Sequence, residues 1–322
     1  DLDVLIFDSG GIFVEYHQNM YMENEGSCAG MVLMRADACW GKFRENSLSQ
    51  DVTLNQFCKV KPGGAVEPFD GVHAGSTLAT FDEEADGVKE LVLGDLIFDG
   101  LTYLHNGGSN TAALMDSSDN LFPIYDTPAK VYIFPAAFFM DVNNDGKDDM
   151  IAAPNGVNTS VNRDNVWYYR NVDPGNGVRL SLETKTMLVD EMIDVGMGAY
   201  PVFFDYNADS LLEMLVGNFS LKVTNSHVTS GLALYENIGT KTDPRYELVT
   251  RDYNNFSTIF TPEIFGMTPA VGDLDNDGDL DLVVNNINDP ALVYQNLAME
   301  QGRGHYLNIQ FEGPKGNQKG LG

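Results

Sequence analysis

The chain has 322 residues, and its 47 acidic against 19 basic side chains give a formal net charge of −28. A surface of this sign repels phosphate groups, so no nucleic-acid partner is expected. A hydrophobic content of 43% with 11% aromatic residues excludes a wholly disordered chain. No segment has the roughly 20 consecutive apolar residues that cross a bilayer, so no membrane span is expected either.

Residues 1–23 resemble the end of a structural repeat. Asp1, Leu2 and Asp3 with the next three residues match residues 279–284, and a short aromatic segment ending at Asn19 follows. Aromatic and β-branched residues in short runs favour strands. We therefore predict that this segment is the end of a truncated β-propeller blade.

Residues 24–72 are predicted to be an insertion that projects from the rim of the fold. The stretch between an aromatic segment that ends in Asn and the next aspartate-rich loop is nearly 30 residues longer here than later in the chain. It holds all three cysteines, Cys28, Cys39 and Cys58. One disulfide with one free thiol fits an oxidising compartment, whereas three reduced thiols are the alternative. Pairing of Cys39 with Cys58 and pairing of Cys28 with Cys39 both remain open.

Residues 73–297 contain an internal repeat, which is typical of a β-propeller. Four loops at 82–90, 141–149, 205–213 and 273–281 share the pattern D-x-[DNE]-x-D-[GS]-x-x-[DE], and their starts are 59, 64 and 68 residues apart. An apolar run follows each loop, and an aromatic segment that ends in Asn comes next. A period of this size suits four short strands with their turns, so we predict an all-β fold with four blades here.

The loops have the chemistry of a calcium site. Oxygen side chains at positions 1, 3 and 5, Gly at position 6 and a backbone carbonyl at position 7 suit a hard cation. Unlike the EF-hand, these loops have their last acid at position 9 and not at position 12. Zinc lacks Cys or His ligands here. Ser210 replaces Gly where a left-handed backbone is expected, at a cost of roughly 1 kcal/mol.

We predict Ca²⁺ as the cofactor, bound by at least two of the four loops, and no catalytic residue in the chain; occupancy of the loops that begin at Asp82 and Asp205 stays open. The predicted ligands, including the backbone carbonyls at position 7, are Asp82, Glu84, Asp86, Val88 and Glu90; Asp141, Asn143, Asp145, Lys147 and Asp149; Asp205, Asn207, Asp209, Leu211 and Glu213; and Asp273, Asp275, Asp277, Asp279 and Asp281.

These loops, together with Phe265-Gly266 ahead of the fourth loop, resemble the FG-GAP/VCBS repeats of integrin-α-like β-propellers. The resemblance implies a β-propeller built from repeats of about 60–68 residues, within a ring of seven blades. Residues 298–322 resemble the opening strand of the ASPIC/UnbV-type module that often follows such repeats.

The resemblance also implies a secreted or cell-surface bacterial protein, exported in many relatives by the type IX route. Such propellers bind partners or act as spacers, so we expect a non-catalytic binding, adhesion or scaffolding module. Its expected partner is a protein or a glycan at the cell surface. The alternative is a propeller-type carbohydrate-active enzyme, a polysaccharide lyase or hydrolase, because a catalytic carboxylate pair would be hidden among so many acids.

Overall fold

The structure is a computed structural model that describes residues 2–46, 48–58, 76–156, 159–224, 227–259 and 265–302. The chain divides into two compact units, Asp1–Asp194 and Val195–Gly322, and each is taken by itself. Strands dominate both units, and the helices are single turns. Within the described segments, no helix has the length and apolar character to cross a membrane.

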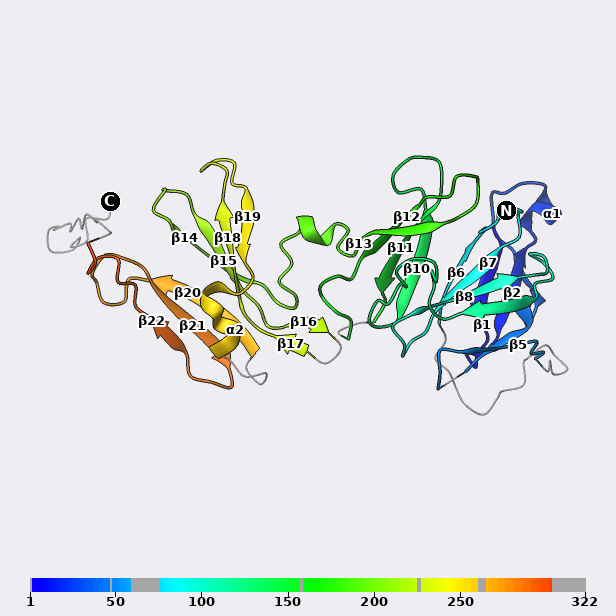
Figure 1. Cartoon of the computed structure of the whole chain (residues 1–322), viewed down its shortest axis with the longest axis horizontal. Coiled ribbons are helices and arrows are strands. Elements are labelled where there is room, and N and C mark those ends of the chain that lie inside the picture. The colour runs from blue at the N-terminus through cyan, green and yellow to red at the C-terminus, as the bar shows by residue number, and fades with distance from the viewer. Residues whose placement is uncertain are drawn as a thin grey trace. The chain divides into compact units, whose positions relative to one another are not determined.

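Within its described residues, the first unit contains three antiparallel sheets and one hairpin (Figure 1). The sheets are β1 (Val4–Phe7), β2 (Val14–Asn19) and β3 (Leu33–Asp37); β6 (Thr77–Phe81), β7 (Glu90–Gly94), β8 (Leu101–Asn106) and β9 (Met115–Asp119); and β10 (Pro135–Met140), β11 (Asp149–Pro154), β12 (Trp167–Asn171) and β13 (Leu180–Thr184). The hairpin is β4 (Phe43–Glu45) with β5 (Val52–Leu54), and the helices are α1 (Tyr21–Glu25) and the 3₁₀ turns Trp40–Lys42 and Val189–Glu191.

The part of the second unit that the structure describes contains two antiparallel sheets and one hairpin. They are β14 (Tyr200–Phe204), β15 (Glu213–Gly217), β18 (Leu232–Asn237) and β19 (Tyr246–Thr250); β20 (Phe265–Gly272), β21 (Asp281–Ile287) and β22 (Leu292–Tyr294); and the hairpin of β16 (Leu221–Thr224) and β17 (His227–Thr229). The helical turns are Tyr253–Asn255 and α2 (Phe256–Ile259).

Each aspartate-rich loop connects the first and second strands of a sheet. The four loops join β6 to β7, β10 to β11, β14 to β15 and β20 to β21, and position 9 is always the first residue of the second strand. The Asn that closes the aromatic segment is the last residue of β8, β12 and β18, which are the third strands of their sheets. The predicted all-β fold is therefore confirmed as a series of antiparallel sheets, whereas a closed propeller stays a prediction.

The core lies between consecutive sheets. Two of the second strands, β7 and β15, are buried at every residue. In the first unit, one cluster joins Val92 of β7 to Met150 and Tyr169 of the next sheet. In the second unit, Leu215 of β15 packs with Val284 of β21. Apolar runs covered on both faces explain why these strands lack the alternation of half-exposed strands.

The cysteine segment does not project as predicted where the structure describes it. Leu33–Asp37 is β3, which pairs with β2 in the first sheet; β2 ends in Asn19 and therefore corresponds to the third strand of the other sheets. Trp40 and Phe43 are only 2% and 1% exposed. Both aromatic side chains pack with Leu91 and Leu93 of β7, because apolar rings gain more from burial than from projecting into water. Residues 59–72 of the segment lie outside the described residues.

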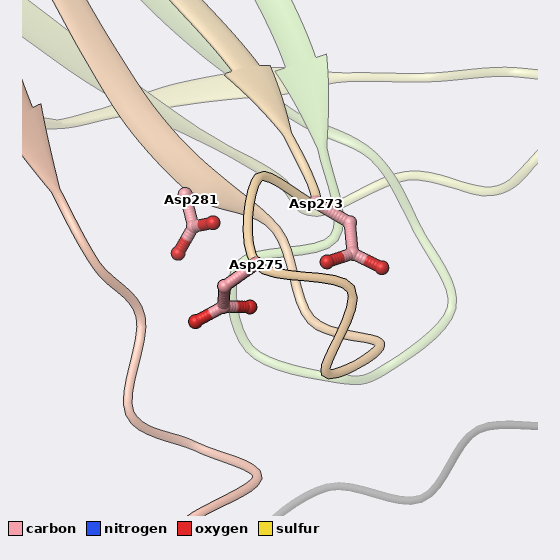
Figure 2. Close-up of side chains that lie close together, drawn as sticks. All are labelled: Asp273, Asp275 and Asp281. Carbon is pink, nitrogen blue, oxygen red and sulfur yellow. The ribbon is translucent and has the colours of Figure 1, made fainter.

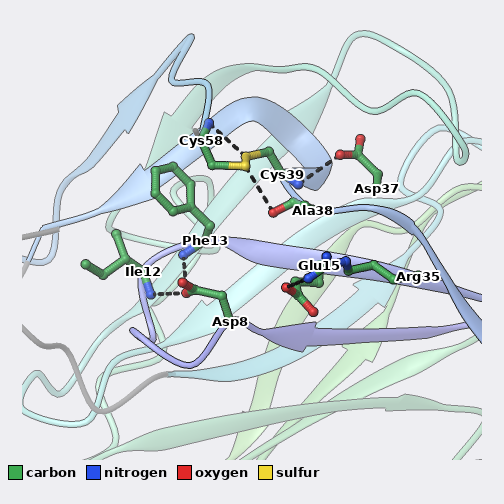
Figure 3. The surroundings of a disulfide bond; sticks show 9 residues. All are labelled: Asp8, Ile12, Phe13, Glu15, Arg35, Asp37, Ala38, Cys39 and Cys58. Atoms are coloured by element: carbon green, nitrogen blue, oxygen red, sulfur yellow. Dashed lines mark hydrogen bonds and ion pairs between the residues drawn. A yellow bond between two sulfur atoms is a disulfide. The ribbon is translucent and has the colours of Figure 1, made fainter. Parts of the chain in front are cut away.

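One disulfide joins Cys39 to Cys58, with 5.9 Å between their Cα atoms (Figure 3). Cys28 is a free, exposed thiol. The prediction of one disulfide plus one thiol is confirmed, and the structure selects one of the two pairings left open. Asp37 supports the bridge by accepting a 2.8 Å hydrogen bond from the Cys39 amide.

Candidate metal centre

The four aspartate-rich loops adopt one backbone shape. Position 4 has a left-handed φ of 59–63° in every loop, at Ala85, Asn144, Ala208 and Asn276. Position 6 is left-handed too, with φ of 86° at Gly87, 87° at Gly146, 71° at Ser210 and 99° at Gly278. The left-handed backbone expected at Ser210 is therefore present, and the serine bears the strain that glycine avoids elsewhere.

The acid at position 1 closes the turn in the first three loops. Asp82, Asp141 and Asp205 each accept hydrogen bonds of 2.9–3.1 Å from the amides of positions 5 and 6. The acid at position 5 in turn accepts the amide of position 7 in all four loops, at 2.7–3.1 Å. These bonds define the turn and direct the loop's oxygens toward its interior.

The acid at position 9 is buried in every loop. Glu90, Asp149, Glu213 and Asp281 are 0–3% exposed, and each accepts the amide of position 2 at 2.7–3.2 Å. Burial raises the pKa of Glu90. Oε1 of Glu213 is buried and accepts no hydrogen bond within the described residues. An uncompensated carboxylate oxygen is costly, so it marks a place where a cation would be stabilising.

Two of these acids also bind the end of the third strand. Asp149 accepts the amide of Asn171 at 2.7 Å, and Asp281 accepts that of Asn296 at 2.8 Å. Asp3 accepts the amide of Asn19 in the same way, at 2.9 Å. Asp3 thus occupies the position-9 place of the first sheet, as its sequence match to Asp281 predicts.

The fourth loop brings its carboxylates closest together (Figure 2). One oxygen from each of Asp273, Asp275 and Asp281 lies within 4.8 Å of the others. A second group within the same limit joins Asp275 and Asp277 to Glu300, which lies beyond the predicted loop. Oxygens that lie this close together repel one another unless a cation or protons lie between them.

Two oxygens of this loop also lack partners in the described part of the chain. Oδ2 of Asp277 and Oδ1 of Asp279 are buried and accept no hydrogen bond. Calcium takes six to eight oxygen ligands at about 2.3–2.6 Å from carboxylates, carbonyls and water. The donor set of the fourth loop therefore fits calcium, with Asp273, Asp275, Asp277 and Asp281 offering carboxylates and Asp279 its predicted carbonyl.

The other three loops do not gather three acids in this way within the described residues. Position 1 is already held by two amides there, and position 3 is Asn143 in the second loop and Asn207 in the third. Both asparagines accept the amide of position 5, at 2.8 and 3.0 Å. The same turn carries the remaining predicted ligands of these loops at positions 3 and 7, among them Glu84, Val88, Lys147 and Leu211.

Sequence reasoning recognised the asparagine after each aromatic segment but not its role. The buried side chains of Asn19, Asn106, Asn171 and Asn237 each accept two amide hydrogen bonds of 2.9–3.1 Å from the connection that follows the third strand. The signal was the fixed Asn itself, since a turn-forming residue that recurs at a strand end indicates a side-chain-held turn.

Tyrosines on the third strand are a second missed feature. Tyr16 donates to Asp3 at 2.6 Å, and Tyr168 donates to Asp149 at 3.0 Å. Burial, and then the bond to the carboxylate, raises the pKa of each phenol to about 12. Both hydroxyls therefore stay protonated and orient the acid at the loop end.

A comparison with known protein families supports the repeat seen in the sequence and the structure. Residues 205–284 match the FG-GAP-like repeat family, a span that contains the third and fourth loops. No curated protein matches the chain. The chain thus contains an FG-GAP-like repeat. The ASPIC/UnbV-type module at 298–322 stays a prediction, because residues 303–322 lie outside the described residues and the match ends at residue 284.

Proposed function

We propose that this chain is a calcium-stabilised β-propeller segment that serves as a non-catalytic binding, adhesion or scaffolding module outside the cell. The observation that carries the proposal is the carboxylate group of Asp273, Asp275 and Asp281 in the fourth loop (Figure 2). It lies within the FG-GAP-like match, and its last acid, Asp281, is the first residue of β21.

Calcium would act through the connections that its ligands make. Asp281 is the first residue of β21 and accepts the amides of Leu274 and Asn296. A cation bound to this acid would join the loop, the second strand and the end of the third strand. When bound, calcium supplies positive charge and no redox chemistry; the residues supply the oxygens and fix their positions.

The architecture supports the propeller part of the proposal. Three sheets run through four neighbouring antiparallel strands in spatial order, which is the arrangement of a propeller blade. Neighbouring sheets share apolar cores face to face. In such folds each repeat is stabilised by its neighbours. The ring of seven blades comes from the resemblance and belongs to this proposal.

An extracellular or outer-membrane location, reached by the type IX route, is also proposed. The Cys39–Cys58 disulfide supports it, because disulfides persist in oxidising compartments. Extracellular calcium at millimolar concentration would saturate loops of micromolar affinity, which oxygen-rich sites reach. A cell-surface protein or glycan is the proposed partner.

The test is thermal unfolding of the full chain in calcium and then in EGTA. Calcium at a hundredfold excess over Kd would stabilise a singly occupied chain by about 2.7 kcal/mol, so the midpoint should fall in EGTA. Asp275→Ala should lose part of this difference. The matched control is Asp289→Ala, which removes an exposed acid in the same unit outside the loops.

An unchanged midpoint in EGTA would contradict calcium stabilisation. The non-catalytic role has its own test, incubation of the intact protein with acidic polysaccharides followed by analysis of chain length. Cleavage would favour the carbohydrate-active enzyme instead.

A further inference from the structure

A cavity of about 350 Å³ opens in the first unit beside the first aspartate-rich loop. Its wall includes Glu83, Tyr103, Ser117, Ser118, Asp119 and Tyr125. These residues come from the loop at 82–90, from β8 and β9, and from the connection after β9. The volume falls within the roughly 300–1,000 Å³ of small-molecule sites.

Aromatic rings form the apolar part of this cavity. Tyr103 and the buried Phe122 stack with their ring centroids 5.4 Å apart and their planes at 10°. The Tyr125 ring is 36% exposed, and the Arg179 guanidinium lies 4.7 Å from its centroid. The Tyr125 hydroxyl also accepts the amide of Leu180 at 3.0 Å. These contacts fix the ring before any ligand arrives, which lowers the entropic cost of binding.

Polar groups form most of the rest of the cavity lining. Oδ1 of Asp119 accepts the amide of Leu121 at 2.9 Å, which orients the carboxylate and leaves Oδ2 for a ligand. Ser117 shares a face of the sheet with Tyr103 and Asp119, since side chains alternate along β9. Ser117 is exposed, and within the described residues its hydroxyl has no hydrogen-bond partner. Glu83 is held by the hydroxyl of Tyr103. The cavity therefore offers carboxylate acceptors and hydroxyl groups next to fixed aromatic rings.

We propose that this cavity binds an uncharged sugar residue. The C–H face of a pyranose packs on aromatic rings, while its hydroxyls donate to carboxylates and exchange hydrogen bonds with a serine such as Ser117. A purely apolar ligand would desolvate the carboxylates of Glu83 and Asp119 without adding any hydrogen bond to them. An anionic sugar would meet both carboxylates in a chain whose net charge is −28.

A cationic ligand is the main chemical competitor, since acids and aromatic rings also attract ammonium groups. Two features favour the sugar. Arg179 already lies over Tyr125 as a cation of the protein itself. The Ser117 hydroxyl suits a ligand with several hydroxyls better than a compact positive charge. The inference rests on the proposed binding function and specifies the glycan as its partner.

The experiment is titration of the full chain, in calcium, with methyl glycosides of glucose, galactose and mannose and with N-acetylglucosamine. Saturation-transfer NMR detects binding and calorimetry measures it. Glucuronic acid and choline are the anionic and cationic probes. We expect at least one uncharged sugar to bind, and glucuronic acid to bind at least tenfold more weakly.

Variants locate the site. Asp119→Asn keeps the bond to Leu121 but loses the charge, and Ser117→Ala removes one exposed hydroxyl. Each should weaken binding, Asp119→Asn by at least tenfold, since hydrogen bonds to charged groups exceed the 1.4 kcal/mol that corresponds to tenfold. The control is Asp243→Asn, an exposed acid of the second unit, which should bind as the parent does.

The inference would be overturned if none of the uncharged sugars bound at millimolar concentration, or if choline alone bound. It would also be overturned if the Asp119→Asn variant bound the sugar as tightly as the parent does. Repeating the titration in EGTA, beside thermal melts, keeps the two proposals distinct. Calcium stabilisation without sugar binding would remove only the sugar site. Sugar binding without calcium stabilisation would support the site and contradict the calcium proposal.

Discussion

At the scale of single residues, the buried asparagine at the end of the third strand holds the turn that follows. Asn171 is 3% exposed, accepts the amides of Asp173 and Arg179, and donates to the carbonyl of Gly177. Loss of these three bonds leaves backbone groups to find other partners, at roughly 1 kcal/mol each. Asn171→Ala should therefore destabilise the chain by about 2–3 kcal/mol in urea unfolding.

The control for this prediction is Asn176→Ala in the same connection, where the side chain is exposed. This variant should unfold within about 0.5 kcal/mol of the parent, as is usual for surface substitutions. Equal stability of the two variants would mean that the buried asparagine is not what holds the turn.

A second residue-scale prediction concerns Glu45, which is only 6% exposed at the end of β4. Burial is the main cause that raises the pKa of Glu45 to about 8; the charge of Asp95 adds to the rise, and the hydrogen bond from Ser76 opposes it. The folded state therefore holds this proton at pH values where the unfolded state has released it. Stability from this group is present in acid and is lost as the pH rises toward 8.

In numbers, the free energy of unfolding should fall by about 1.4 kcal/mol per pH unit between roughly pH 5 and 8 because of this one group. Glu45→Gln keeps a similar shape without the charge, so its stability should be less pH-dependent and should exceed that of the parent at pH 8. Urea unfolding of both proteins across this range, at constant calcium, checks the difference. Parallel pH profiles would show that Glu45 is not buried as an acid.

At the scale of elements, neighbouring sheets approach each other at glycines that end the second strands. A Cβ atom added to Gly94 of β7 would overlap the carbonyl oxygen of Pro135 in β10, and one added to Gly217 of β15 would overlap that of Met267 in β20. Thr77 donates to the same Pro135 carbonyl at 2.7 Å. Close contact between sheets therefore depends on the missing side chain.

Gly94→Ala should accordingly destabilise the chain by about 3 kcal/mol, since overpacking a tight contact costs about 1–3 kcal/mol or more. Gly272→Ala is the matched control, because a Cβ atom at this strand glycine meets nothing within 4 Å. Thermal unfolding of both variants measures the difference. A Gly94→Ala protein as stable as the control would mean that the two sheets can separate without cost.

The sequence predicts the second and third strands of each sheet much better than the outer ones. Apolar runs and aromatic segments predict β7, β8, β11 and β12 because these strands bury half or more of their residues. The outer strand β9 reads Met-Asp-Ser-Ser-Asp with three exposed residues, so no hydrophobic pattern distinguishes it from a loop. For the same reason the exposed strand β3 was assigned to an insertion.

The candidate site was predictable in its residue types but not in its arrangement. One motif assigns equivalent ligands to all four loops, yet only the fourth loop gathers three acids among the described residues. The difference lies in side-chain direction: the acid at position 1 turns to amides in the first three loops. Glu300, which joins Asp275 and Asp277, is outside the motif altogether, so a local pattern could not include it.

At the scale of the whole molecule, two loops belong to each compact unit, and the close carboxylate groups belong to the second. A chain with two units need not unfold in one step, so calcium can stabilise one unit more than the other. We predict that removal of calcium with EGTA lowers the unfolding temperature of the unit Val195–Gly322 more than that of Asp1–Asp194, as measured by calorimetry. Asp275→Ala in calcium should lower the same transition and leave the other within experimental error.

The two transitions can be assigned with variants confined to one unit. Asn171→Ala should shift the transition of the first unit, whereas Asp275→Ala should shift that of the second. High salt separates general charge repulsion from specific binding, because screening acts on all exposed acids of a chain with net charge −28 while calcium acts at the loops. If EGTA lowers both transitions equally at high salt, calcium binding is distributed over all four loops, and the close approach of Asp273, Asp275 and Asp281 does not set affinity.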